Sequence, residues 1–193
     1  MDKKEFVSLV IESLEAIGEE YRKPYGRPYE RIICYEFYHQ LRKRLDEKRS
    51  QLVLHGELGK GYRGIRKVPD FVFHLPRTDV ENFAVMEFKS VRSGMRWIRH
   101  DLRKLEECRK APLNYQLGIL VIFGEKNKLV HIEERLLKLS DRIDRDLEIL
   151  LYDSDDGKVI SSVVIGKSSI PVSYTHLRAH ETSLHLVCRL LLE

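Results

Sequence analysis

Apolar residues recur every three or four positions in the first fifty residues, which is typical of amphipathic helices. The spacing predicts one helix over residues 2–21, with Gly18 as a candidate stop signal. A second helix is predicted over residues 29–48, after a breaker segment that contains two prolines and a glycine. The apolar face of this second helix comprises Cys34, Phe37, Tyr38, Leu41 and Leu45.

The pattern changes to strand-like alternation after residue 50. It predicts strands at 51–58, 70–75 and 82–91, and the short connection between the last two favours a hairpin. The following elements are a helix at 94–110, a buried central strand at 115–123, a largely helical segment at 126–144, and strands at 147–152 and 159–165. A helix between two strands usually makes them parallel, so we expect an α/β fold with a mixed sheet flanked by helices.

Length and composition are those of one domain. The 193 residues, 42% of them hydrophobic, suffice for a single core, which we expect to span residues 1–170. From Pro171 onward the sequence resembles a translated sequencing-adapter remnant. We therefore expect residues 171–193 to be a non-native tail, and we assign no role to its metal-ligand residue types, namely His176, His180, His185 and Cys188.

The cellular setting follows from what the sequence lacks. No stretch approaches the roughly 20 apolar residues that span a bilayer, and the first residues lack the apolar run of a signal peptide. Three cysteines without paired spacing suit a reducing compartment. We therefore expect a cytoplasmic protein without a membrane partner.

The net charge of +4 permits a nucleic-acid partner without indicating one, because recognition depends on where basic residues cluster. Lys and Arg gather at 42–49, at 60–67 and at 92–104. We expect these three clusters to flank the candidate site.

Candidate chemistry falls on the second and third predicted strands. Glu87 and Lys89 are two residues apart and therefore share one face of a strand, and an antiparallel pairing would bring Asp70 near them. Two converging carboxylates repel each other unless a cation joins them, and their oxygen ligands suit Mg²⁺. A bound metal could polarise a phosphodiester and acidify a water that Lys89 orients. The pattern predicts a metal-dependent hydrolytic site.

Pro69-Asp70, followed after a spacer by Glu87-Phe88-Lys89 on the next strand, resembles the PD-(D/E)xK nuclease superfamily. The similarity covers roughly residues 29–123. It implies a restriction endonuclease-like αβββαβ core and a Mg²⁺-dependent nuclease, with Mn²⁺ as an alternative cofactor, that hydrolyses nucleic acid and most naturally DNA. Asp70 and Glu87 would be metal ligands, with Lys89 beside them as the third catalytic residue.

The resemblance also implies supporting residues. Many members add a glutamate from the preceding helix to the metal site, and Glu36 is the matching position, with Glu57 at a strand end as its rival. Some members place a glutamine near the strand after the second core helix, for which Gln116 is the candidate.

Substrate contacts are predicted outside the motif. Lys60 and Arg63 lie in a glycine-bearing loop that could hold a phosphate backbone, and Lys104 is the preferred backbone contact on the next helix, unless it forms a surface ion pair with Asp101. Nucleases of this size often dimerise, so a homodimer is compatible with the sequence. Two alternatives stay open: a non-catalytic nucleic-acid- or protein-binding module of the same fold, and an unrelated α/β domain in which the three motif residues lie far apart.

Overall fold

The computed structural model describes residues 1–57, 68–75 and 82–167, so the predicted tail lies outside the described residues. The described elements follow in the order α1 (Lys3–Glu15), α2 (Glu19–Arg22), the 3-10 turn η1 (Pro24–Gly26), α3 (Glu30–Glu47), β1 (Val53–Gly56), β2 (Phe71–His74), β3 (Asn82–Ser90), η3 (Val91–Ser93), α4 (Met95–Cys108), β4 (Leu117–Gly124), α5 (Lys126–Leu137), η4 (Ser140–Arg142), β5 (Leu147–Asp153) and β6 (Lys158–Ile165).

One six-stranded sheet holds the strands in chain order. β1, β2 and β3 form an antiparallel meander. α4 then returns the chain so that β4 pairs parallel to β3, and β5 pairs parallel to β4 before β6 turns back. This confirms the predicted mixed sheet and the parallel crossover.

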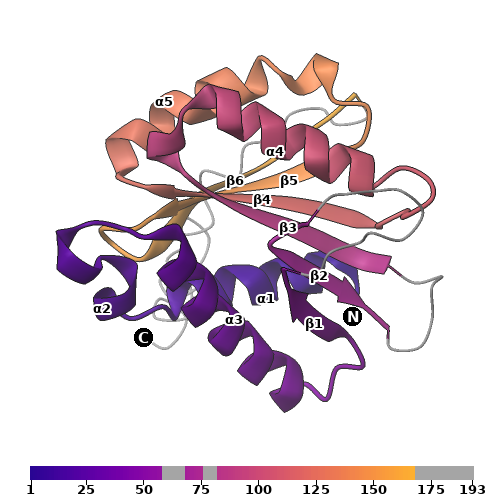
Figure 1. The fold of residues 1–193 in the computed structure, drawn as a ribbon, viewed down its shortest axis with the longest axis horizontal. Helices are drawn as coiled ribbons and strands as arrows, with labels where there is room; N and C mark the ends of the chain where they lie inside the picture. The colour runs from indigo at the N-terminus through magenta and orange to yellow at the C-terminus, as the bar shows by residue number, and fades with distance from the viewer. Residues whose placement is uncertain (58–67, 76–81, 168–193) are drawn as a thin grey trace, which may run out of the picture.

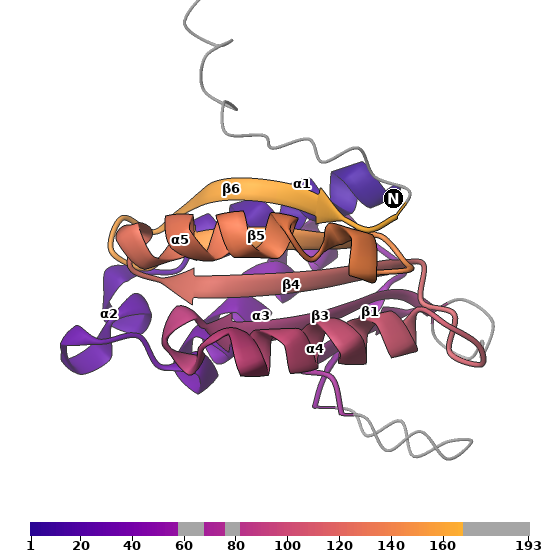
Figure 2. The ribbon, with the colours of Figure 1, turned by 90° about the horizontal axis from the view of Figure 1, so that it is seen from above.

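Helices cover both faces of the sheet: α4 and α5 lie on one face, and α1 and α3 lie on the other (Figure 1). Figure 2 shows α4 and α5 running side by side over their face. Because strand side chains alternate, each face has its own core. Phe37, Phe73 and Phe88 are buried on the α1/α3 face, whereas Val85 and Leu102 are buried on the α4/α5 face. β4 is buried along its whole length, as the sequence predicted for a central strand.

The first predicted helix is too long. α1 ends at Glu15, Ala16 caps it, and Gly18 takes an extended conformation and starts the short α2. Ile17, which follows the end of α1, is 3% exposed and packs in the same core, so burial of the apolar stripe does not require the helix to continue. The segment predicted as helical to residue 144 likewise leaves the helix after Leu137 and continues through η4.

Candidate active site

The β2–β3 pairing brings Asp70 beside Glu87. Phe71 is paired with Met86 in an antiparallel register, so Asp70, just before Phe71, lies next to Glu87, just after Met86. Oδ2 of Asp70 accepts a hydrogen bond of 2.7 Å from the backbone N–H of Phe88, which holds the carboxylate against β3. The predicted antiparallel arrangement is therefore present, and the two motif carboxylates belong to one site.

Glu87 is a buried carboxyl on the α4 side of the sheet. The residue is only 1% exposed, and Nζ of Lys104 on α4 lies 2.6 Å from its Oε1. Burial, and after it the negative charge of Asp70, raise the pKa of Glu87 to about 9, although Lys104 opposes the shift. Burial also raises the pKa of Asp70. Burial therefore disfavours the ionised form of both carboxyls, and a bound cation would favour it.

Lys89 lies between the helices of the two faces. Its Nζ is 3.2 Å from Oε1 of Glu30 at the start of α3, and 3.5 Å from Oδ2 of Asp101 on α4. Burial alone would lower the pKa of Lys89, but the charges of Glu30 and Asp101 outweigh it and raise the pKa. Lys89 therefore stays an ammonium group that can orient or neutralise a ligand, and it is not a general base.

The ionised side chains at the candidate site carry a net negative charge. Asp70, Glu87, Glu30 and Asp101 contribute four negative charges when ionised, and Lys89 and Lys104 contribute two positive ones, so two negative charges remain. One divalent cation would balance them.

Glu30, which sequence reasoning missed, is the α3 carboxylate that reaches the site. Glu36 lies six residues further along, about 120° around the helix axis from Glu30, and its Oε1 accepts a hydrogen bond of 2.7 Å from Gln40. Among the described residues, Glu36 makes no hydrogen bond or ion pair with Asp70, Glu87 or Lys89. The motif spacing could not choose between the two, because either glutamate lies on the helix before the strands.

The pairing expected between Asp101 and Lys104 is replaced by two ion pairs to β3. Asp101 is 4% exposed and faces Lys89, whereas Lys104 faces Glu87. A signal for Asp101 did exist in the sequence. It falls on the apolar stripe of α4 beside Ile98 and Leu102, where a charged residue needs a partner inside the protein.

A cavity of about 450 Å³ opens beside Asp70 on the α3 side. Its lining residues are Glu30, Arg31, Cys34, Tyr35, Tyr38, Gly56, Glu57, Asp70 and Phe71. The rival carboxylate Glu57 is thus present, and its backbone N–H donates a hydrogen bond of 2.9 Å to the carbonyl of Asp70. Glu30 and Glu57 both share this cavity with Asp70, and Glu36 does not line it.

The predicted basic clusters differ in their relation to the site. Lys60 and Arg63 lie outside the described residues. The cluster at 42–49 does not flank the site, because Arg44 is fourteen residues along α3 from Glu30, which is about 21 Å at the rise of an α-helix. The 92–104 cluster does lie near it, because Lys104 contacts Glu87 directly.

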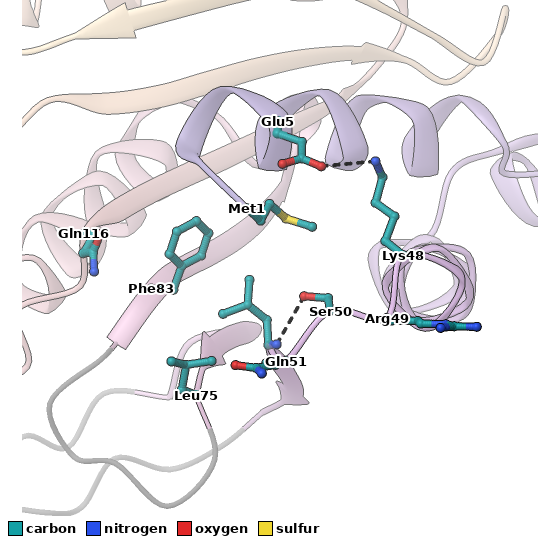
Figure 3. A pocket seen from close by; sticks show the side chains of 10 residues that line it. Met1, Glu5, Lys48, Arg49, Ser50, Gln51, Leu75, Phe83 and Gln116 are labelled. Atoms are coloured by element: carbon teal, nitrogen blue, oxygen red, sulfur yellow. Dashed lines mark hydrogen bonds and ion pairs between the residues drawn. The ribbon is translucent and has the colours of Figure 1, made fainter.

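Gln116 lies elsewhere. It lines a second cavity of about 580 Å³ with Glu5 and Lys48, which form an ion pair of 3.2 Å (Figure 3). Gln116 precedes β4, whereas Glu87 is paired with Leu120, four residues further along the chain. The structure therefore does not bring Gln116 to the candidate site.

The two motif carboxylates are a donor set that suits magnesium. In the described parts of the chain, no three His, Cys, Asp or Glu side chains gather as a ready ligand cluster. Structural and catalytic zinc sites use three or four protein ligands, whereas Mg²⁺ commonly takes one or two carboxylates and completes its shell with water and substrate oxygens. Asp70 and Glu87 match the second pattern.

Comparison of the chain with protein-family models, with curated proteins and with solved structures finds no match. No helix among residues 1–57, 68–75 and 82–167 is long and apolar enough to cross a membrane.

Proposed function

We propose that this chain is a metal-dependent nuclease that hydrolyses phosphodiester bonds of nucleic acid, and of DNA in particular. The observation that carries the proposal is the convergence of Asp70 and Glu87 on neighbouring strands, with Lys89 on the same strand as Glu87. The order α3, β1, β2, β3, α4, β4 is αβββαβ, with a meander followed by a parallel strand. This order supports a restriction endonuclease-like fold and the PD-(D/E)xK resemblance.

Asp70 and Glu87 would hold Mg²⁺ or Mn²⁺. Such a cation, when bound, polarises the scissile phosphodiester and lowers the pKa of a bound water. The burial that raises the pKa of Glu87 also keeps the two carboxylates in a medium of low dielectric, where their attraction for a cation is strongest. Hydrolysis at this site needs no covalent intermediate with the protein.

Lys89 would orient the attacking water or offset charge that develops on the phosphate. Two carboxylates hold its ammonium group: Glu30 on α3, from one face of the sheet, and Asp101 on α4, from the other. These two contacts limit the positions that Nζ can take, so Glu30 and Asp101 act as positioning residues for Lys89.

The outer face of α4 supports a nucleic-acid substrate. Arg96, Arg99 and Arg103 follow helical spacing and are exposed, and no ion pair holds them within the described residues. Phosphate contacts of this kind position a nucleic acid without reading its sequence. Lys104, at the edge of the same helix, is close enough to Glu87 to contact a phosphate at the site.

The proposal predicts cleavage that depends on a divalent metal. Purified protein should cut DNA in the presence of Mg²⁺ or Mn²⁺, and EDTA should stop the reaction. Gel electrophoresis of labelled single-stranded and duplex DNA, with RNA in parallel, measures this. Nucleic-acid binding without cleavage in any metal would instead favour a non-catalytic module of the same fold.

Glu30 and Glu36 offer a matched pair of variants. Glu30→Gln should lower the rate of cleavage about 10- to 100-fold, as is typical when a partner of an active-site group is lost. Glu36→Gln should leave the rate unchanged, because the Glu36 side chain bonds to Gln40 on its own helix. Initial rates over a series of Mg²⁺ concentrations separate the two. If Glu36→Gln lowered the cleavage rate as much as Glu30→Gln, Glu36 would again be a candidate metal ligand.

A further inference from the structure

The cavity beside Asp70 has the size of a small-ligand site. Its volume of about 450 Å³ falls within the roughly 300–1,000 Å³ common for ligand pockets. It shares Glu30 and Asp70 with the candidate active site. A nucleotide whose phosphate lies at the carboxylates would therefore have its sugar and base within reach of this cavity.

The walls of the cavity carry aromatic rings. Tyr35 and Tyr38 are one turn apart on α3, and they are 64% and 37% exposed. The ring centroid of Tyr38 is 6.2 Å from that of Phe71, which is buried beneath it. Exposed tyrosines beside a cavity form a stacking platform, on which a base of any identity gains contact because every base has a π-face.

Polar groups complement the rings. Arg31 lines the cavity and is exposed, and no ion pair engages it within the described residues. Its guanidinium group can stack on a base or bind a phosphate oxygen. Glu57 lines the cavity as well, and a carboxylate can accept hydrogen bonds from the exocyclic amino groups of bases.

We propose that this cavity binds an unpaired nucleobase of the substrate, adjacent to the phosphodiester that is cut. A base inside a duplex has both faces stacked, so only an unpaired nucleotide can place its face against Tyr35. The preferred substrate is therefore single-stranded DNA, or the single-stranded end of a duplex. The position relative to the scissile phosphate rests on the proposed nuclease function, whereas binding of the base does not.

Fluorescence anisotropy with labelled DNA in EDTA tests binding without cleavage. A short single strand should bind more tightly than the duplex of the same sequence. Tyr35→Ala should weaken single-strand binding about 5- to 150-fold, which is the range for loss of one stacking contact, and should leave duplex binding unchanged. The side chain is exposed and alanine favours helices, so the variant should keep the fold.

Two further variants serve as controls. Tyr35→Phe keeps the ring and should bind like the unchanged protein. Tyr25→Ala removes a tyrosine that is 94% exposed but does not line the cavity, and it should also bind normally. Equal affinity for single strand and duplex, or normal binding by Tyr35→Ala, would overturn the proposal.

A cleavage assay separates this inference from the proposed function. If single-strand binding depends on Tyr35 but no metal supports cleavage, the nuclease proposal fails and the base-binding cavity stands. If the protein cuts duplex and single strand equally and Tyr35→Ala cuts as fast, the cavity proposal fails and the nuclease stands.

Discussion

Replacing Lys89 with alanine is expected to lower Mg²⁺-dependent cleavage by about 100- to 1,000-fold, the usual cost of removing one group that stabilises developing charge. Asp70→Ala should lower cleavage at least as far, because it removes a proposed metal ligand. Lys89→Ala also removes the partner of the buried Asp101 carboxylate, so the variant should unfold at a lower temperature, and its rate is compared at a temperature where it is still folded. Single-turnover rates and circular dichroism measure the two effects.

Lys110→Ala is the matched control for Lys89→Ala. Lys110 is also held by two carboxylates, Glu106 and Asp144, but it follows the end of α4 and its side chain is 44% exposed. This variant should cut DNA at the unchanged rate. Normal cleavage by both Lys89→Ala and Asp70→Ala would refute the assignment of the site.

Replacing Glu87 with glutamine should abolish cleavage and yet stabilise the protein when no divalent cation is present. Burial disfavours the ionised carboxyl, so at neutral pH folding in EDTA requires Glu87 to take up a proton, whereas an amide requires none. A gain on the order of 1 kcal/mol would raise the Tm of a domain this size by about 2–4 °C. Differential scanning fluorimetry in EDTA measures it.

The sign of the pH dependence follows from the raised pKa of Glu87. Below its ordinary pKa of 4.5 the group is protonated in the folded and unfolded states alike. Between 4.5 and about 9 the unfolded chain loses this proton first, so the folded state loses stability as pH rises. The Tm in EDTA should therefore fall less steeply with rising pH in Glu87→Gln than in the unchanged protein. Equal slopes would contradict the raised pKa.

In Mg²⁺ the unchanged protein should have a higher Tm than Glu87→Gln, the reverse of the order expected in EDTA. A cation that binds the folded protein raises its Tm, and Glu87→Gln should lose most of that increase. Glu148→Gln is the control, since Glu148 on β5 is another carboxyl whose pKa is raised by burial, and it bonds to Ser162 away from the site. It should cut DNA normally and show the full Mg²⁺ response. A full response in Glu87→Gln would exclude Glu87 as a ligand.

The pattern of apolar and polar residues was enough to predict the order of the main elements and the relation of the motif residues. Strand side chains alternate with a period of two, so the placement of Glu87 and Lys89 on one face is a local property. The short connection between β2 and β3 made their pairing antiparallel, and this put Asp70 next to Glu87. The uninterrupted apolar run of β4 indicated a strand buried on both faces.

Which helix residues contact the motif could not be predicted, because it depends on how the helices dock on the sheet. A helix presents side chains all around its axis, and the docking of its apolar stripe sets which of them face the sheet. That docking placed Glu30 rather than Glu36 beside Lys89, and it set Asp101 and Lys104 against β3 rather than against each other. These ion pairs join residues far apart in the chain, and no local spacing encodes them.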